Sequence, residues 1–180
     1  MKKYKYCIII ILILFDQFTK LYTHFNMDKN KIGEIKIINK VKVHYILNPG
    51  IAFGIQIGYK NEKSFIVIAK IIIISIILIQ LNNIDKKRII KNKTAIPLVL
   101  ITTGAIGNFI DNIFYGKIIN NYIYNSNIIY GQVIDMIYIN IYDLKINKFY
   151  ISILPIFNMS DIFITIGVMI MIIEKIKNKY

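Results

Sequence analysis

The chain has 180 residues, of which 56% are hydrophobic, and its mean hydropathy is +0.53. This is too apolar for an ordinary soluble domain, and the length predicts one domain, residues 1–180. The single cysteine, Cys7, excludes an internal disulfide and a multi-cysteine metal site. The net charge of +13 comes mostly from lysines beside apolar runs, with one arginine, Arg88. It therefore indicates membrane lipid headgroups as partners and no nucleic acid.

The first predicted element is a membrane helix over about residues 4–24. An apolar run at 6–15 follows three lysines, as in a signal peptide. However, Asp16 and Lys20 stand where a cleavage site would need small residues. Asp16 and Lys20 are four residues apart and would share one helix face near its far end.

Residues 25–63 are polar and contain seven lysines. Between residues 40 and 46 apolar and polar side chains alternate, which predicts a half-buried strand. The strand leads into Asn48, Pro49 and Gly50, where proline followed by glycine suits the central positions of a type II turn.

Three further apolar segments follow, and each is typical of a membrane helix. They cover about residues 64–81, 95–115 and 155–173, and Lys70 lies well inside the first of them. A basic loop separates the first two, and a connection rich in Tyr, Asn and Ile separates the last two. No internal repeat is visible.

Four spans place both termini on one side of the membrane. The lysine-rich ends and the 82–94 loop then face the cytoplasm, as the positive-inside rule requires, although the lysines at 25–63 oppose it. In this orientation four carboxylates fall in one layer near the external face: Asp16, Asp111, Asp135 and Asp161. A carboxylate in hydrocarbon costs roughly 2.5–3.5 kcal/mol, so such residues are functional candidates.

Structural explanations compete with the functional one. Gly104, Asn108 and Asp111 share a helix face, which could be a packing face with a polar end, since glycine lets a neighbouring helix approach closely. Asn158 and Asp161 have the spacing of a helix N-cap and its third residue, so a helix start explains them as well as catalysis does.

Two adjacent acids at a water-accessible membrane surface suit aspartic-type hydrolysis. They would share a proton, one acting as base on a water while the other polarises the carbonyl. The spacing does not say which two of the four acids form the pair. The alternative is a small proton-coupled membrane transporter that uses the carboxylates as a relay. Transporter sites usually lie near the bilayer midplane, between repeats, which this sequence does not match. A catalytically inactive scaffold is a third interpretation.

Five motifs in one order resemble the lipoprotein signal peptidase (signal peptidase II) family. They are DQFTK at 16–20, NPGIAFG at 48–54, GAIGNFID at 104–111, GQVIDM at 131–136 and FNMSD at 157–161. The resemblance implies an all-α polytopic membrane protein with four transmembrane helices and a small external β-containing region. It also implies an aspartic endopeptidase of the bacterial inner membrane. That enzyme cuts diacylglyceryl-modified prolipoproteins before the lipidated cysteine and uses no metal or other cofactor.

The resemblance also assigns site residues. The positions matching the family's catalytic pair are Asp135 and Asp161. The positions expected to support the site or bind substrate are Asp16, Lys20, Asn48, Gly50, Asn108, Asp111 and Asn158.

The chain departs from the family in two places. The family usually has arginine after the acid of the third helix, and here that position is Asn112, so the charge contact of the arginine is missing unless Lys117 or Lys70 supplies it. Lys70 is otherwise explained by snorkelling to the outer interface. The segments 116–131 and 136–157 look longer than usual.

Overall fold

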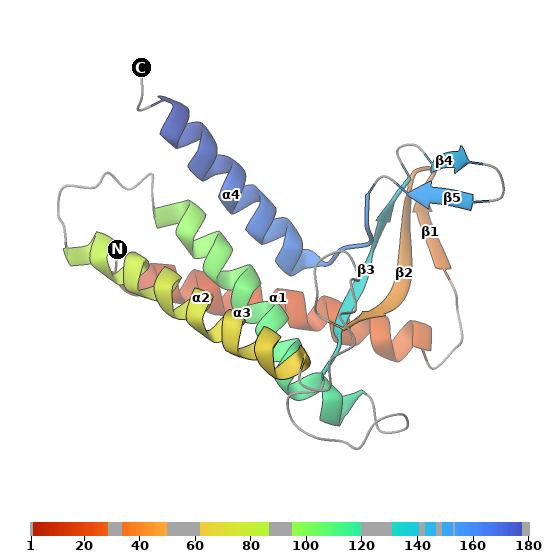
Figure 1. The fold of residues 1–180 in the computed structure, drawn as a ribbon, viewed down its shortest axis with the longest axis horizontal. Coiled ribbons are helices and arrows are strands. Elements are labelled where there is room, and N and C mark those ends of the chain that lie inside the picture. Colours follow the sequence, from red (N-terminus) through yellow and green to blue (C-terminus); the bar gives the residue numbers. More distant parts are fainter. Residues whose placement is uncertain are drawn as a thin grey trace.

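The computed structural model of the protein describes residues 2–28, 34–49, 62–86, 95–119, 131–140, 143–146, 149–152 and 154–177. Four long helices carry a small β-sheet at one end (Figure 1). The helices are α1 (Lys2–Thr23), α2 (Glu62–Lys86), α3 (Ala95–Ile118) and α4 (Met159–Lys177). A π-helical stretch, His24–Asp28, extends α1. The expected helix positions are confirmed, and each helix runs a few residues beyond one or both ends of its apolar segment.

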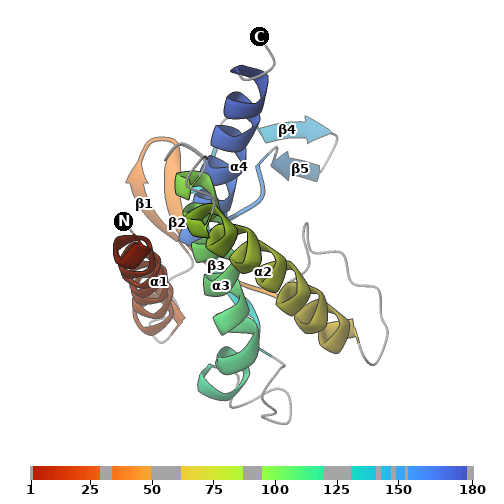
Figure 2. The ribbon, with the colours of Figure 1, turned by 90° about the vertical axis from the view of Figure 1, so that its left-hand side faces the viewer.

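Helix α3 is the centre of the bundle, because it contacts α1, α2 and α4. Figure 2 shows α1, α2 and α4 arranged around it. Its closest packing is against α4, at two glycines. A Cβ atom at position 104 would lie 2.2 Å from the carbonyl oxygen of Ser160, and one at 107 would lie 2.1 Å from the Ser160 Oγ. The expectation that Gly104 admits a neighbouring helix is therefore confirmed, and Gly107 allows the same close approach.

Three helices in the described part of the chain are long and apolar enough to cross a membrane: Tyr4–Met27, Ser64–Ile84 and Ala95–Ile118. Their outward faces expose many large apolar side chains, as lipid-facing surfaces do. Helix α4 is not among the three. Only twelve residues separate Asp161 in its first turn from Glu174, which is short of the roughly 20 apolar residues that a bilayer requires.

The sheet has three antiparallel strands in the order β1 (Glu34–Ile38), β2 (Val41–Asn48) and β3 (Val133–Ile139). A second antiparallel pair joins β4 (Asp143–Ile146) to β5 (Phe149–Ser152). The strand expected at 40–46 is confirmed as β2, whose Val43, Tyr45 and Leu47 pack on a core of Tyr115, Ile134 and Met136. The expected combination of a helical bundle with a small β-containing region is therefore confirmed, and the fold is mostly helical with a small sheet.

Strand β3 is the element that sequence reasoning missed. Residues 116–154 had been expected to form a mixed connection, yet β3 crosses the end of the bundle and pairs with β2 along its length. Its residues 133–136 are all buried, so no alternation of apolar and polar side chains marks it.

Candidate active site

Asp135 lies on strand β3, and the pairing of β3 on both of its edges fixes the position of this residue. β3 pairs with β2 on one edge, where Asp135 lies opposite Ile46. On the other edge, Ile137 bridges Phe157, the residue that precedes the start of α4. The amide N–H of Ile137 donates to the Phe157 oxygen at 2.8 Å. This short bridge brings the start of α4 next to Asp135.

Asp161 lies in the first turn of α4 and takes part in a reciprocal cap. The Asn158 Oδ1 accepts from the amide of Asp161 at 3.0 Å, and the Asp161 Oδ2 accepts from the amide of Asn158 at 3.2 Å. This satisfies a backbone donor of the helix start. The helix-start interpretation is therefore confirmed. It does not compete with a role in the site, because the other Asp161 oxygen accepts from Asn108 Nδ2 at 2.8 Å.

Side-chain amides join the two carboxylates. Asn158 Nδ2 donates to Asp135 Oδ1 at 2.7 Å, and Asn48 Nδ2 donates to Asp135 Oδ2 at 2.9 Å. Asn158 Nδ2 also lies 3.2 Å from Asn108 Oδ1. The Asn158 amide therefore contacts both Asp135 and Asn108, and Asn108 in turn donates to Asp161. Three asparagines from β2, α3 and the start of α4 thus orient both acids.

The pKa of Asp135 is raised from its ordinary value of 3.8 to about 6. Burial is the largest cause, because it disfavours the charged form, and the nearby charge of Asp161 acts in the same direction. The amides of Asn48 and Asn158 act in the opposite direction, since they hydrogen-bond the ionised form. Asp135 is therefore the carboxyl that holds a proton under mildly acidic conditions.

The other two acids form a separate, fully buried cluster behind the first pair. Lys20 Nζ lies 2.7 Å from Asp16 Oδ2 and 2.6 Å from Asp111 Oδ2, and all three side chains are 0% exposed. The four acids expected in one layer are thus two pairs. Asp16 and Asp111 are both ion-paired with Lys20, whereas Asp135 and Asp161 face a cavity.

The cluster is connected to the site at two points. Lys20 Nζ donates to Asn108 Oδ1 at 3.0 Å, which leaves the Asn108 Nδ2 to face Asp161. Asp16 Oδ1 accepts from the amide of Ser160 at 2.8 Å, so it caps α4 from a different helix.

Two members of this cluster were not among the expected site residues. Gln17 donates to Asp111 Oδ1 at 2.8 Å, and Tyr115 donates to Gln17 Oε1 at 2.9 Å. Gln17 lies inside the first motif, but nothing in its spacing marks it as a partner of Asp111, because the contact joins two different helices.

The structure therefore brings together eight of the nine expected site residues. They are Asp16, Lys20, Asn48, Asn108, Asp111, Asp135, Asn158 and Asp161. Gly50 and the predicted turn after Pro49 lie outside the described residues. Within the described part of the chain, no three His, Cys, Asp or Glu side chains are grouped so as to hold a metal ion.

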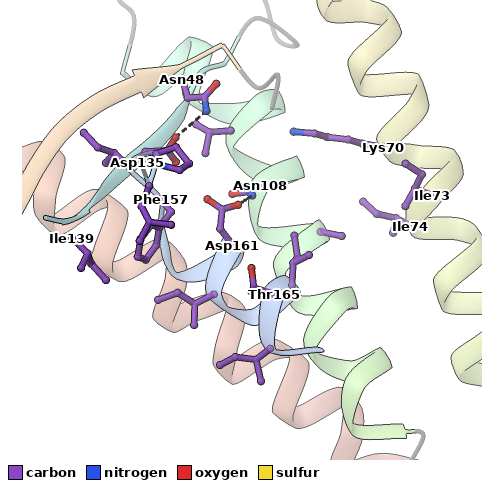
Figure 3. Close-up of a pocket in the computed structure, with 18 residues that line it drawn as sticks. Asn48, Lys70, Ile73, Ile74, Asn108, Asp135, Ile139, Phe157, Asp161 and Thr165 are labelled. Atoms are coloured by element: carbon purple, nitrogen blue, oxygen red, sulfur yellow. Dashed lines mark hydrogen bonds between the residues drawn. The ribbon is translucent and has the colours of Figure 1, made fainter. Parts of the chain in front are cut away.

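Asp135 and Asp161 face a cavity of about 680 Å³. Figure 3 shows them on one wall with Asn48 and Asn108, while Lys70, Ile73 and Ile74 of α2 form the facing wall. The remaining lining is mostly apolar and comes largely from the segment before α4 and its first turns. The site thus offers two carboxyl groups beside a space for an apolar ligand.

Helices long and apolar enough to cross a membrane, arranged around a pair of carboxylates that face a cavity, define a polytopic membrane protein. The family model of Signal peptidase (SPase) II matches residues 8–177. A lipoprotein signal peptidase of Amoebophilus asiaticus (strain 5a2) is 38% identical over 180 residues, which cover 94% of this chain and 76% of that protein. A lipoprotein signal peptidase of Wigglesworthia glossinidia brevipalpis is 32% identical, and the match covers 97% of this chain and 95% of that protein.

Solved structures agree with these sequence matches. A bacterial membrane enzyme solved by the in meso method at 2.3 Å resolution has a TM-score of 0.66 to this chain and 29% sequence identity. The similarity covers 98% of this chain and 90% of that one. The chain belongs to the signal peptidase II family.

Proposed function

We propose that this protein is a membrane aspartic endopeptidase that removes the signal peptide from diacylglyceryl-modified prolipoproteins, cutting before the lipidated cysteine. Family membership supports the protease activity and the lipoprotein substrate. The observation that supports the aspartic mechanism is the pairing of Asp135 and Asp161 through Asn158 beside an apolar cavity. No feature of the site favours the transporter alternative.

In the proposed mechanism Asp135 carries the shared proton and Asp161 is ionised. Asp161 takes a proton from a water as its oxygen attacks the scissile carbonyl, and Asp135 gives its proton to the carbonyl oxygen. The tetrahedral intermediate then breaks its C–N bond. Asp161 returns its proton to the leaving amine, and the hydroxyl of the intermediate returns one to Asp135. The asparagines keep both carboxyls oriented throughout.

The test is cleavage of a purified prolipoprotein by the purified protein. The diacylglyceryl-modified form should be cut before the modified cysteine, and the unmodified form should remain intact. Absence of cleavage, or equal cleavage of both forms, would contradict the proposal.

We further infer that α4 is a fourth span and that both termini face the cytoplasm of a bacterial inner membrane. Helix α4 packs along α3, and Lys175 and Lys177 at its far end suit a cytoplasmic interface. Reporter fusions near residues 88 and 180 should read cytoplasmic, and those near 35 and 125 external. A cytoplasmic signal at 125 would reverse α3 and refute this topology.

The pH dependence of cleavage should reflect the proton on Asp135. Since its pKa in the unliganded site is about 6, kcat/KM should fall about tenfold per pH unit above pH 6, where that proton is lost. At low pH the rate should fall again as the ionised partner is protonated, which gives a bell shape that belongs to the pair. A profile that is flat from pH 5 to pH 8 would exclude Asp135 as the acid.

The same pKa predicts how pH affects stability. The folded state holds the Asp135 proton more tightly than the unfolded state, so folding is favoured below about pH 4 and loses this contribution as pH rises through 6. The thermal midpoint of Asp135→Asn should lack this part of the pH dependence. If wild type and variant respond identically to pH between 4 and 7, the pKa is not raised.

A further inference from the structure

Lys70 is the feature of the cavity that the proposed mechanism does not use. It lies on α2, across the cavity from the two aspartates, and Figure 3 shows its side chain reaching towards α3. Among the described residues that line the cavity, it carries the one positive charge. An ammonium group in a mostly apolar, half-buried place is costly unless it has hydrogen-bond acceptors.

Asn112 fixes the position of this ammonium group. Lys70 Nζ donates to Asn112 Oδ1. The Asn112 amide is buried and is itself oriented, because its Nδ2 donates to the Gly131 oxygen at 3.2 Å. The Asn112 backbone oxygen also accepts from the Gly131 amide at 2.9 Å. Asn112 therefore holds its side-chain oxygen towards Lys70.

The ammonium group keeps donors available for a ligand. It has three N–H groups, and among the described residues Asn112 is its one hydrogen-bond acceptor. Lys20 differs, because it donates to Asp16 and Asn108 and also forms an ion pair with Asp111. The charge of Lys70 is attracted most strongly by Asp111, is repelled by Lys20, and is attracted more weakly by Asp161 and Asp135. If these two acids share one proton, their net charge of −1 is offset by Lys70.

We propose that Lys70, held by Asn112, binds a carbonyl oxygen of the lipid-modified segment of the substrate and thereby positions the scissile bond against Asp135 and Asp161. The inference rests on the proposed function. A carbonyl oxygen is an uncharged acceptor that can enter an apolar cavity, and its bond to an ammonium is charge-assisted. The substrate class carries such oxygens in two places, the esters of the diacylglyceryl group and the peptide backbone.

Lys117 provides the matched control. It was the other lysine that could replace the missing arginine, but it is exposed in the last turn of α3 and does not line the cavity. Lys117→Met removes the same charge by the same substitution at a position outside the lining of the cavity.

The experiment compares wild type, Lys70→Met, Lys70→Arg and Lys117→Met on two prolipoproteins. One carries the natural diester glyceryl group, and the other carries a dialkyl ether analogue that lacks the ester carbonyls. Lys70→Met should lower kcat/KM about 10–100-fold, mainly through KM, as loss of a charge-assisted hydrogen bond does. Lys70→Arg should restore most of the rate because it retains donors, and Lys117→Met should match wild type.

The two substrates identify the carbonyl. A penalty for Lys70→Met on the diester alone assigns the ester carbonyl, and a penalty on both substrates assigns a peptide carbonyl. If Lys70→Met has the same kcat/KM as wild type on both substrates, the inference is overturned. Snorkelling to the outer interface then remains as the explanation of Lys70. A loss that appears in kcat with unchanged KM, with a lower thermal midpoint and no rescue by arginine, would also overturn it, since it indicates a structural role. If wild type itself cleaves neither substrate, it is the proposed function that fails.

Discussion

Replacing Asp161 with Asn is expected to abolish cleavage of the lipid-modified substrate while leaving an inserted, folded protein. Loss of a positioned acid or base removes about 10²–10⁴-fold in rate, and here one residue serves as both in turn. Asn keeps the shape of the side chain, but it cannot take the proton of the attacking water. Asp135→Asn should have the same effect, because an amide cannot deliver a proton to the carbonyl oxygen.

The double variant separates a catalytic pair from two independent groups. If Asp135 and Asp161 act as a unit, the double Asn variant should be little slower than either single one. Turnover is to be measured at matched levels of membrane-inserted protein. Substantial cleavage by either single variant would refute the assignment.

Stability must be followed in the same variants, because Asp161 also caps α4. Both of its oxygens accept hydrogen bonds, from Asn108 and from the Asn158 amide, and Asn has only one acceptor oxygen. A penalty of about 1–3 kcal/mol is therefore expected from one unsatisfied donor. Glu174→Gln is the matched control, since it neutralises a carboxylate at the opposite end of the same helix. It should retain full activity.

The helices could be predicted from the sequence because a bilayer requires long apolar runs. The run at 64–81 indicates α2 without any knowledge of its neighbours, and the alternation at 40–46 indicates β2 in the same way. β3 could not be predicted, because its residues 133–136 are buried on both faces and present no alternation. The helix expected at 155–173 is present as α4, but its apolar part is bounded by Asp161 and Glu174 and is too short to indicate a membrane span by itself.

The site was predictable only in part, because the spacing of residues along one helix does not show which residues of other helices they contact. The i, i+4, i+7 spacing places Asn108 and Asp111 on one face of α3, but it does not say that Asn108 meets Asp161 while Asp111 meets Lys20. That division depends on how closely α3 and α4 approach at Gly104 and Gly107. The choice of Asp135 and Asp161 as the pair came from the family resemblance. The geometry agrees with it, because these two acids face the cavity and the other two are ion-paired.

Lys20→Met should cause the largest loss of stability of any single substitution considered. Lys20 is 0% exposed and forms ion pairs with both Asp16 and Asp111, which are equally buried. Removing one partner of a buried ion pair leaves an uncompensated charge and costs about 3–5 kcal/mol. Because a folded protein is typically stable by about 5–15 kcal/mol, the thermal midpoint of the detergent-solubilised protein should fall sharply. Lys42→Met is the control, since its pair with Glu34 lies at the surface, where solvent screens the two charges.

A triple variant then distinguishes the two roles of Lys20. Lys20→Met combined with Asp16→Asn and Asp111→Asn leaves no buried charge in the cluster, so much of the lost stability should return. Activity should not return with it. Lys20 also donates to Asn108 Oδ1, and without that bond the Asn108 amide can rotate away from Asp161. An unchanged thermal midpoint for Lys20→Met would refute the charge argument, and full activity of the triple variant would refute the link through Asn108. Recovery of the midpoint without recovery of turnover is the result expected if one lysine both neutralises the buried acids and orients the site.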